Sequence, residues 1–178
     1  MSMRAQVERL VAAGVPDVAG VSADEFRELA ADLTGEGVLC VHPELAGPSQ
    51  LAPLLRRGDR PGFVVADMDD LDGDDLLGWT PDRALPEILA RGRSPLTIGE
   101  GISWLLQAPE VLEPNRCFMC IGSRKRKARG LDARTPAIWI SRGTGRDGAD
   151  RRDVPKVGWC WAGNHHTWLG FASALSRS

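Results

Sequence analysis

The sequence predicts an α+β fold, in which helices from the N-terminal half pack on one face of an antiparallel sheet of four to six strands that ends in a tryptophan-rich β-hairpin. Helical apolar spacing and helix-capping residues occur mainly before residue 110, and strand-like apolar runs follow one another after residue 116. This order favours α+β over a doubly wound α/β sheet. At 178 residues the chain is most simply one domain, residues 1–178, long enough to bury a sizeable core.

Three helices are predicted from apolar spacing and capping residues. Apolar side chains at helical spacing predict a first helix over residues 4–13. Ser22 and Glu25 form a capping box that opens a second helix, whose apolar face extends to Leu33. Thr97 and Glu100 repeat this signature before a third helix that ends by Pro109.

Short apolar runs predict strands at residues 38–41, 63–66, 117–121 and 137–141. Between them, residues 53–55 suggest a short helix or turn, and residues 81–90 a short, interrupted helix. The segment from 67 to 75 carries six aspartates and is expected to be an exposed acidic loop. Residues 143–153 are rich in Gly, Arg and Asp and almost without apolar side chains, which predicts a disordered loop.

The C-terminal hairpin is predicted over residues 156–171, with its turn at Gly163-Asn164. In this register Trp159 faces Trp168 and Trp161 faces His166. Because side chains alternate with period two along a strand, all four side chains share one face. Three indoles around one imidazole predict either an apolar core patch or a binding site for a flat or cationic ligand.

Charge is distributed unevenly along the chain. Residues 1–90 carry 7 basic and 17 acidic residues, and residues 91–178 carry 15 basic and 7 acidic residues. The two halves either attract each other across a shared core or leave a basic surface for an anionic partner. No signal-peptide-like run and no stretch of about 20 apolar residues occurs, so we expect a cytoplasmic protein with reduced thiols and no membrane contact.

Three motifs that suggest a cofactor or a metal do not meet the requirements of such sites. Residues 143–148 match G-x-G-x-x-G, but no helical pattern and no acidic residue at the required distance follow, so no dinucleotide is expected. Cys117 and Cys120 would point to opposite faces of a strand, which disfavours zinc. The aspartate loop does not fit the calcium pattern of an EF-hand. We therefore predict no metal and no cofactor.

Several segments carry a resemblance to a known family. They are R-P-G-F-V-V at residues 60–65, G-R-S-P-L-T at 92–97 before Glu100-Gly101, G-S-R at 122–124, P-A-I-W-I at 136–140, G-W-C-W-A-G-N at 158–164 and H-T-W-L-G at 166–170. With them the chain resembles an uncharacterised family of actinobacterial proteins, a domain of unknown function. The resemblance implies that the family tends to have proline at the position of His165. His166 is then the family-like histidine, and His165 is incidental. It implies no activity.

The first functional hypothesis is a small-molecule site, binding or enzymatic, on the predicted hairpin. Trp159, Trp161 and Trp168 would form its walls, and Arg124 would anchor an anionic group. His166 would supply a hydrogen bond or act as the catalytic acid/base, since surrounding indoles would lower its pKa. The same surroundings suit a neutral core histidine, and whether the protein is an enzyme stays open.

Two further hypotheses involve macromolecular partners. A nucleic acid or another anionic partner would bind the basic half, through residues 124–129 and 146–152. Alternatively, the protein is a non-enzymatic interaction module, for example a homodimer formed through an edge strand of the hairpin, because unpaired edges recruit partners and exposed aromatics anchor interfaces.

Overall fold

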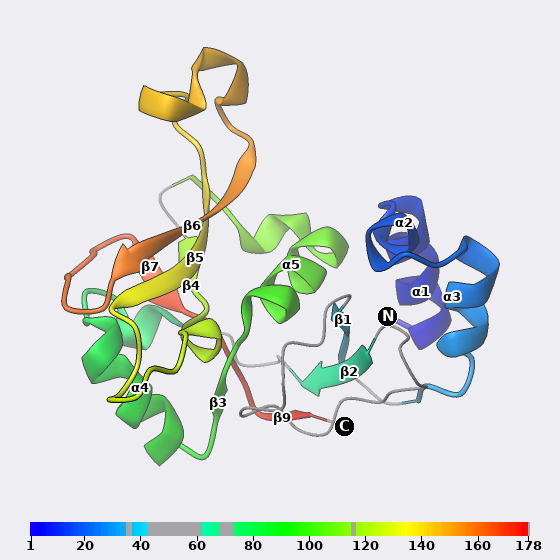
Figure 1. Ribbon diagram of the computed structural model, residues 1–178, viewed down its shortest axis with the longest axis horizontal. Helices are drawn as coiled ribbons and strands as arrows, with labels where there is room; N and C mark the ends of the chain where they lie inside the picture. The colour runs from blue at the N-terminus through cyan, green and yellow to red at the C-terminus, as the bar shows by residue number, and fades with distance from the viewer. Residues whose placement is uncertain (35–36, 43–61, 68–72, 115–116, 178) are drawn as a thin grey trace.

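The computed structural model of the protein describes residues 1–34, 37–42, 62–67, 73–114 and 117–177 (Figure 1). N-terminal helices precede a C-terminal run of mostly antiparallel strands, so the predicted α+β class is confirmed. The turn expected at residues 53–55 and most of the acidic loop lie outside the described residues. None of the described helices combines the length and apolar character needed to cross a membrane.

The N-terminal segment folds into three short helices: α1 (Met3–Ala12), α2 (Val15–Ala19) and α3 (Ala23–Leu29). The helix predicted over residues 4–13 is confirmed as α1. The backbone N–H of Glu25 donates to Ser22 Oγ at 3.2 Å, so the predicted cap starts α3, although this helix ends before Leu33. The short helix α2, which starts directly after Gly14, was not predicted from the sequence.

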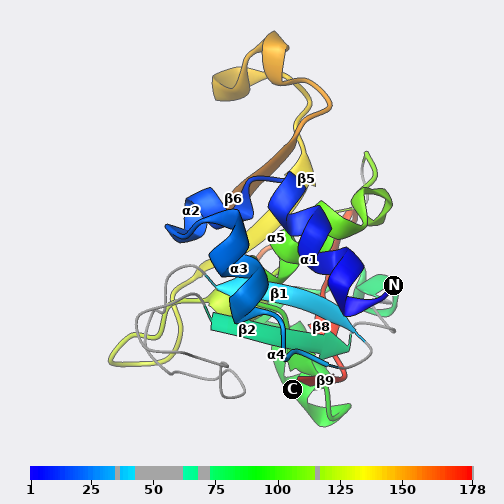
Figure 2. The same cartoon turned by 90° about the vertical axis from the view of Figure 1, so that its right-hand side faces the viewer.

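The predicted strands near residues 40 and 64 are confirmed as β1 (Val38–His42) and β2 (Gly62–Asp67), which pair antiparallel. A short strand β9 (Ser176–Arg177) pairs with β2 from the C-terminal end. The two faces of β1 enter different cores. Leu39 and Val41 pack in the smaller core with side chains of α1 and α3, whereas Cys40 belongs to the larger core around the second sheet. Figure 2 shows α1 and α3 beside β1.

The helix α5 (Ile98–Gln107) lies between the two sheets and contacts both β1 and β5. Its predicted capping box is confirmed, because Glu100 N–H donates to Thr97 Oγ1 and Thr97 N–H donates to the Glu100 carboxylate. The helix α4 (Pro81–Ala90) is continuous across Pro86, so the interruption predicted within residues 81–90 does not occur. Three-residue and four-residue 3-10 turns, such as η1 (Gly73–Leu76) and η3 (Ile121–Ser123), connect these elements.

The second sheet contains four strands in the order β6-β5-β4-β7: β4 (Cys117–Met119), β5 (Arg134–Ile140), β6 (Pro155–Trp161) and β7 (Leu169–Phe171). Strand β7 runs parallel to β4, and the other pairs are antiparallel. Two further short strands, β3 (Ser94–Pro95) and β8 (Ser173–Ala174), form a separate pair. The prediction of one antiparallel sheet was therefore wrong: the described strands divide among three sheets.

The prediction of a hairpin with its turn at Gly163-Asn164 was also wrong. Strand β6 pairs along its whole length with β5, which places Trp159 opposite Pro136 and Trp161 opposite Arg134. A tight turn does follow β6, because Asn164 N–H donates to the carbonyl of Trp161, but the chain then continues to β7. The loop between β5 and β6, residues 141–154, holds the 3-10 turns η4 (Gly145–Asp147) and η5 (Ala149–Arg151), where disorder was predicted.

Candidate functional site

Strand β6 carries the exposed tryptophans at the edge of the second sheet. Its burial alternates from Pro155 to Trp161, which leaves Val157, Trp159 and Trp161 about half exposed, at 54%, 49% and 50%. The two indoles meet edge to face, with ring centroids 4.7 Å apart. We call the residues Val157, Trp159 and Trp161 the outer edge of β6.

The outer edge is exposed because α5 covers the sheet only as far as the neighbouring strand. Ile138 of β5 lies directly opposite Val157, so both side chains are on the same face. Ile138 is buried against Gly101 of α5. Beyond it, Val157 and the tryptophans extend past the helix into solvent.

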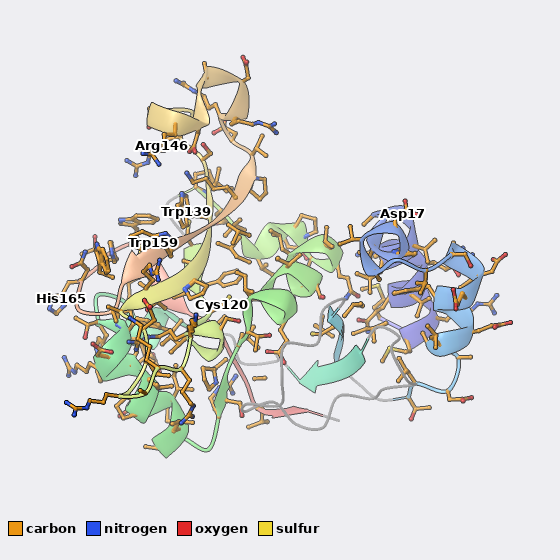
Figure 3. The ribbon with its side chains drawn as sticks, in the orientation of Figure 1. Asp17, Cys120, Trp139, Arg146, Trp159 and His165 are labelled. Atoms are coloured by element: carbon orange, nitrogen blue, oxygen red, sulfur yellow. The ribbon has the colours of Figure 1, made fainter. Side chains whose placement is uncertain are left out.

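The other face of β6 is closed by a third tryptophan. The indole of Trp139, on β5, lies against Gly158, and the ammonium group of Lys156 lies 4.9 Å from the centroid of that ring. Strands β5 and β6 form a hairpin, and Figure 3 shows Trp139 and Trp159 on this β5–β6 hairpin, below Arg146. The hairpin therefore has one covered aromatic face and one open aromatic face.

His166 and Trp168 do not join the tryptophans of β6 in the way predicted. They follow the turn and pair with each other, edge to face, with centroids 5.7 Å apart. Trp168 packs against the larger core. Among the described residues, no ring of this pair contacts the rings of Trp159 and Trp161. The four side chains that were predicted to share one face thus form two separate pairs in the structure.

The two histidines attach this segment to the start of α4. His165 Nδ1 lies 2.8 Å from the carbonyl oxygen of Gly78, and the N–H of Gly78 donates to the carbonyl of His166. His166 Nε2 is buried without a hydrogen-bond partner. Burial lowers the pKa of His166, as the predicted neutral form requires.

Arg124 is buried inside the fold. Its Nη1 donates to Asp82 Oδ1 at 2.8 Å, and its Nε donates to the carbonyl of Asp132 at 2.9 Å. Its side chain is only 5% exposed. These bonds join the first turn of α4 to residues 124–134, so the guanidinium predicted to anchor a ligand is engaged within the protein.

One basic loop, residues 124–134, lies at the Trp161 end of β6. It contains six basic residues and one acidic residue. Asp132 is nearly buried and pairs with both Lys127 and Arg134. Hydrogen bonds from Arg134 and then Lys127 hold the pKa of the Asp132 carboxyl far below its usual range. Three other basic side chains of this loop, those of Lys125, Arg126 and Arg129, are exposed to solvent.

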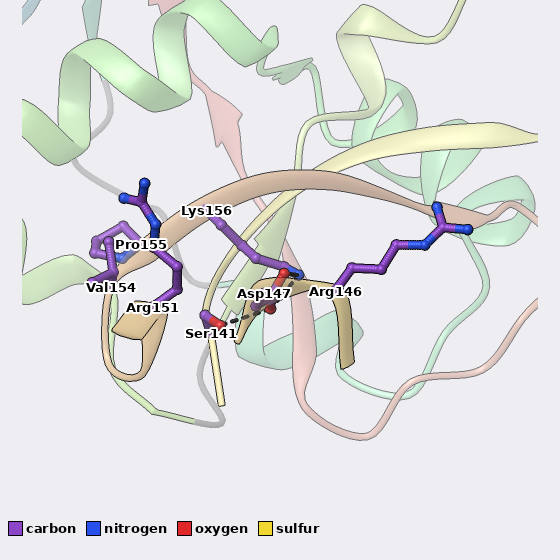
Figure 4. Close-up of a pocket in the computed structure, with 7 residues that line it drawn as sticks. All are labelled: Ser141, Arg146, Asp147, Arg151, Val154, Pro155 and Lys156. Atoms are coloured by element: carbon purple, nitrogen blue, oxygen red, sulfur yellow. Dashed lines mark hydrogen bonds and ion pairs between the residues drawn. The ribbon is translucent and has the colours of Figure 1, made fainter. Parts of the chain in front are cut away.

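A second basic loop, residues 141–154, lies at the Pro155 end of β6 and projects from the body of the protein (Figures 1 and 2). It encloses an open cavity of about 340 Å³, lined by Ser141, Arg146, Asp147, Arg151, Val154, Pro155 and Lys156. Figure 4 shows Asp147 bound to both Lys156 and Ser141, with Arg146 and Arg151 extending to either side. The Lys156 ammonium lowers the pKa of Asp147 and offsets its charge, whereas no described residue pairs with Arg146 or Arg151.

The cysteines are all free thiols, and Cys40, Cys117 and Cys120 are buried. Burial raises the pKa of Cys117, Cys120 and Cys160, which keeps these thiols protonated and unreactive. In the part of the chain that the structure describes, no three His, Cys, Asp or Glu side chains gather as they would around a metal ion.

Trp159 and Trp161 were predicted to share one face, as a core patch or as the wall of a site, but their strand partner and the role of Val157 were not predicted from the sequence. The alternation from Pro155 to Trp161 was the signal that places Val157 on the same face. The cavity beside Ser141 and Asp147 was not predicted either, because that segment has no apolar pattern.

Comparison with known proteins gives a family but no activity. No curated protein and no solved structure matches the chain. A family model, described as a family of unknown function (DUF5701), matches residues 9–73 and 72–178. This agrees with the resemblance to an uncharacterised family that the sequence motifs indicated. The chain belongs to this family of unknown function, DUF5701.

Proposed function

We propose that the protein is a binding protein that recognises an anionic macromolecular partner through the open face of the β5–β6 hairpin. One observation carries the proposal: two half-exposed indoles, Trp159 and Trp161, stand on an edge strand between two basic loops. Exposed large aromatics are the side chains that most often dominate the binding free energy of interfaces.

The two loops supply the electrostatic part of the proposal. Residues 124–134 contain six basic residues and one acidic residue. Residues 141–156 contain five basic and three acidic residues. Cations on both sides of an apolar strip attract an anionic partner and align it along β6. Because most of these charges are exposed, salt at about 0.1 M screens them beyond roughly 10 Å.

The small-molecule hypothesis has less support. None of the predicted ligand residues lines the cavity beside the 141–154 loop. Trp159 and Trp161 face solvent, Arg124 is bound to Asp82, and His166 Nε2 is buried. An acid/base role needs an accessible nitrogen within reach of a substrate. Binding without catalysis is therefore the function that this arrangement favours.

Intrinsic fluorescence with two anionic probes tests the proposal. Poly-L-glutamate and single-stranded oligothymidylate are titrated into the protein at low ionic strength and again with added salt. We expect at least one probe to shift the indole emission, with an affinity that falls steeply as salt rises. Reversing two exposed charges, Arg126→Glu with Arg129→Glu, should abolish the shift, whereas Arg4→Glu on α1 serves as a control remote in sequence.

Either of two results would contradict the proposed function. If neither probe changes the emission of the wild-type protein at low ionic strength, or if the Arg4→Glu control weakens binding as much as the loop variant, the open face of the hairpin is not an anion-binding surface.

A further inference from the structure

The protein closes one free sheet edge with buried side chains. On the side of β1 away from β2, Leu39 N–H donates to Gln6 Oε1 at 2.7 Å, and Val41 N–H donates to Ser103 Oγ at 3.1 Å. Gln107 Nε2 donates to the carbonyl of Leu39 at 2.8 Å. Three polar side chains, all nearly buried, thus satisfy an edge of β1 with which no described strand pairs.

In the part of the chain that the structure describes, no side chain protects the edge of β6 at Val157 and Trp159 in this way. Ala162 N–H donates to the carbonyl of Ala133, and Ser141 N–H donates to the carbonyl of Val154, which fixes the phase of the β5–β6 ladder. Hydrogen-bonded and non-hydrogen-bonded pairs alternate in antiparallel strands. Lys156, Gly158 and Cys160 therefore direct their backbone groups toward β5.

It follows that the N–H and C=O groups of Val157 and Trp159 point away from the sheet. No described residue bonds to them. Their side chains are the exposed apolar ones, so the free backbone groups and the exposed indole lie on the same two residues. An edge of this kind is a template for one more strand, and proteins usually block it with charge, proline or a covering segment.

We propose that the partner is an extended acidic polypeptide segment that adds to β6 as a fifth strand of the second sheet. This inference rests on the proposed function and names its partner class. Backbone groups of Val157 and Trp159 would form the ladder, and alternate apolar side chains of the segment would contact the indoles. Acidic residues at the ends of the segment would meet the two basic loops.

Charge favours this partner over a second copy of the chain. A two-fold pairing of β6 with itself is antiparallel, so the 141–154 loop of one copy would lie beside the 124–134 loop of the other. Both loops carry more basic than acidic residues. Like charges at both ends oppose self-association, whereas an acidic strand neutralises both ends.

Proline at residue 157 tests the ladder directly. Val157→Pro removes an N–H that points away from β5 and keeps every β5–β6 hydrogen bond, a position where proline is tolerated on edge strands. Val157→Ala is the matched control, because it shortens the side chain and keeps the N–H. The probe is a synthetic peptide that alternates valine and glutamate, titrated by tryptophan fluorescence. A peptide of the same sequence, N-methylated along one edge, tests the same bonds on the wild-type protein.

We expect Val157→Pro to weaken binding of the peptide about tenfold or more, with a much smaller effect of Val157→Ala. We expect the N-methylated peptide to bind the wild-type protein at least about tenfold more weakly than the parent peptide. Binding that neither change affects would overturn strand addition, and this result does not depend on whether the proline variant folds.

Two other results would overturn the inference, and the proposed function stands in either case only if an anionic probe still binds. The first is oligothymidylate binding that survives Val157→Pro but is lost in Trp159→Ala, together with no binding of the peptide, which would indicate stacking of bases on the indoles. The second is a wild-type dimer in sedimentation that dissociates in Val157→Pro, which would make a second copy the occupant of the edge. Failure of every anionic probe to bind would instead remove the proposed function itself.

Discussion

The indole of Trp139 lies so close above Gly158 of the neighbouring strand that a β-carbon at residue 158 would overlap ring carbon Cη2. The absence of a side chain at Gly158 therefore leaves the space that the indole fills. With this face filled by Trp139 and the ammonium of Lys156, Trp159 and Trp161 remain on the opposite, open face. This contact fixes which aromatic side chains of the hairpin can meet a partner.

Replacing the glycine should destabilise the hairpin. We expect Gly158→Ala to lower the free energy of unfolding by about 1–3 kcal/mol, because the methyl group forces the indole of Trp139 out of its position. Urea denaturation measures the change. Gly163→Ala is the control, since no atom lies within 4 Å of its added β-carbon. Equal stability of the two variants would mean that Trp139 does not pack on residue 158.

The buried guanidinium of Arg124 should contribute more to stability than its exposed partner. Arg124→Met removes hydrogen bonds to Asp82 and to the carbonyl of Asp132, and we expect a loss of about 1.5–3 kcal/mol in the free energy of unfolding. Asp82 is 62% exposed, so Asp82→Asn should cost less than about 1 kcal/mol. Thermal melts compare the two. A costly Asp82→Asn and a silent Arg124→Met would contradict this placement of Arg124.

The desolvated imidazole of His166 should make stability depend on pH. Its pKa is lower in the folded protein than the ordinary value of 6.5, so the unfolded chain binds the proton more readily. This group therefore leaves stability unaffected above pH 6.5 and reduces it as pH falls below that value. We expect His166→Gln to be less sensitive to pH in this range than the wild-type protein in melts at a series of pH values.

His165 provides the matched control for this experiment. It is exposed, and its contact with the carbonyl of Gly78 lies on the surface. We expect His165→Gln to keep the wild-type pH dependence. If His165→Gln removes the dependence and His166→Gln retains it, the assignment of the buried imidazole is wrong.

The exposure of the outer edge predicts a simple fluorescence result. Trp159 and Trp161 are the two tryptophans about half exposed, and Trp139, Trp79, Trp104 and Trp168 are less exposed. We expect acrylamide to quench a distinct accessible fraction of the wild-type emission, and Trp159→Phe with Trp161→Phe to remove most of it. An accessible fraction that persists in the double variant would place the solvent-exposed indoles elsewhere.

Much of the fold could be predicted from local patterns. The capping box of Thr97 and Glu100 and the apolar runs of β1 and β2 depend on residues close in sequence, and each is confirmed. The period-two rule also placed Trp159 and Trp161 correctly on one face. These signals are local because helix caps and strand alternation are set by neighbouring residues.

The hairpin partner could not be predicted in the same way. A Gly-Asn turn follows Trp161, but the strand that pairs with β6 is β5, reached across the loop from residue 141 to residue 154. Nothing local distinguishes these two pairings. The decisive contact is tertiary: Trp139 requires a residue without a side chain opposite its ring, and Gly158 meets this requirement only in the β5–β6 register.

Hydrogen exchange of individual backbone amides in the free protein tests the open edge most directly. We expect slow exchange for Gly158 and Cys160, whose N–H groups face β5, and fast exchange for Val157 and Trp159, whose N–H groups point away from the sheet. With the valine–glutamate peptide added, the amides of Val157 and Trp159 should become protected. Slow exchange of Val157 and Trp159 in the monomeric free protein would contradict the account, because the edge proposed for a partner would already be closed.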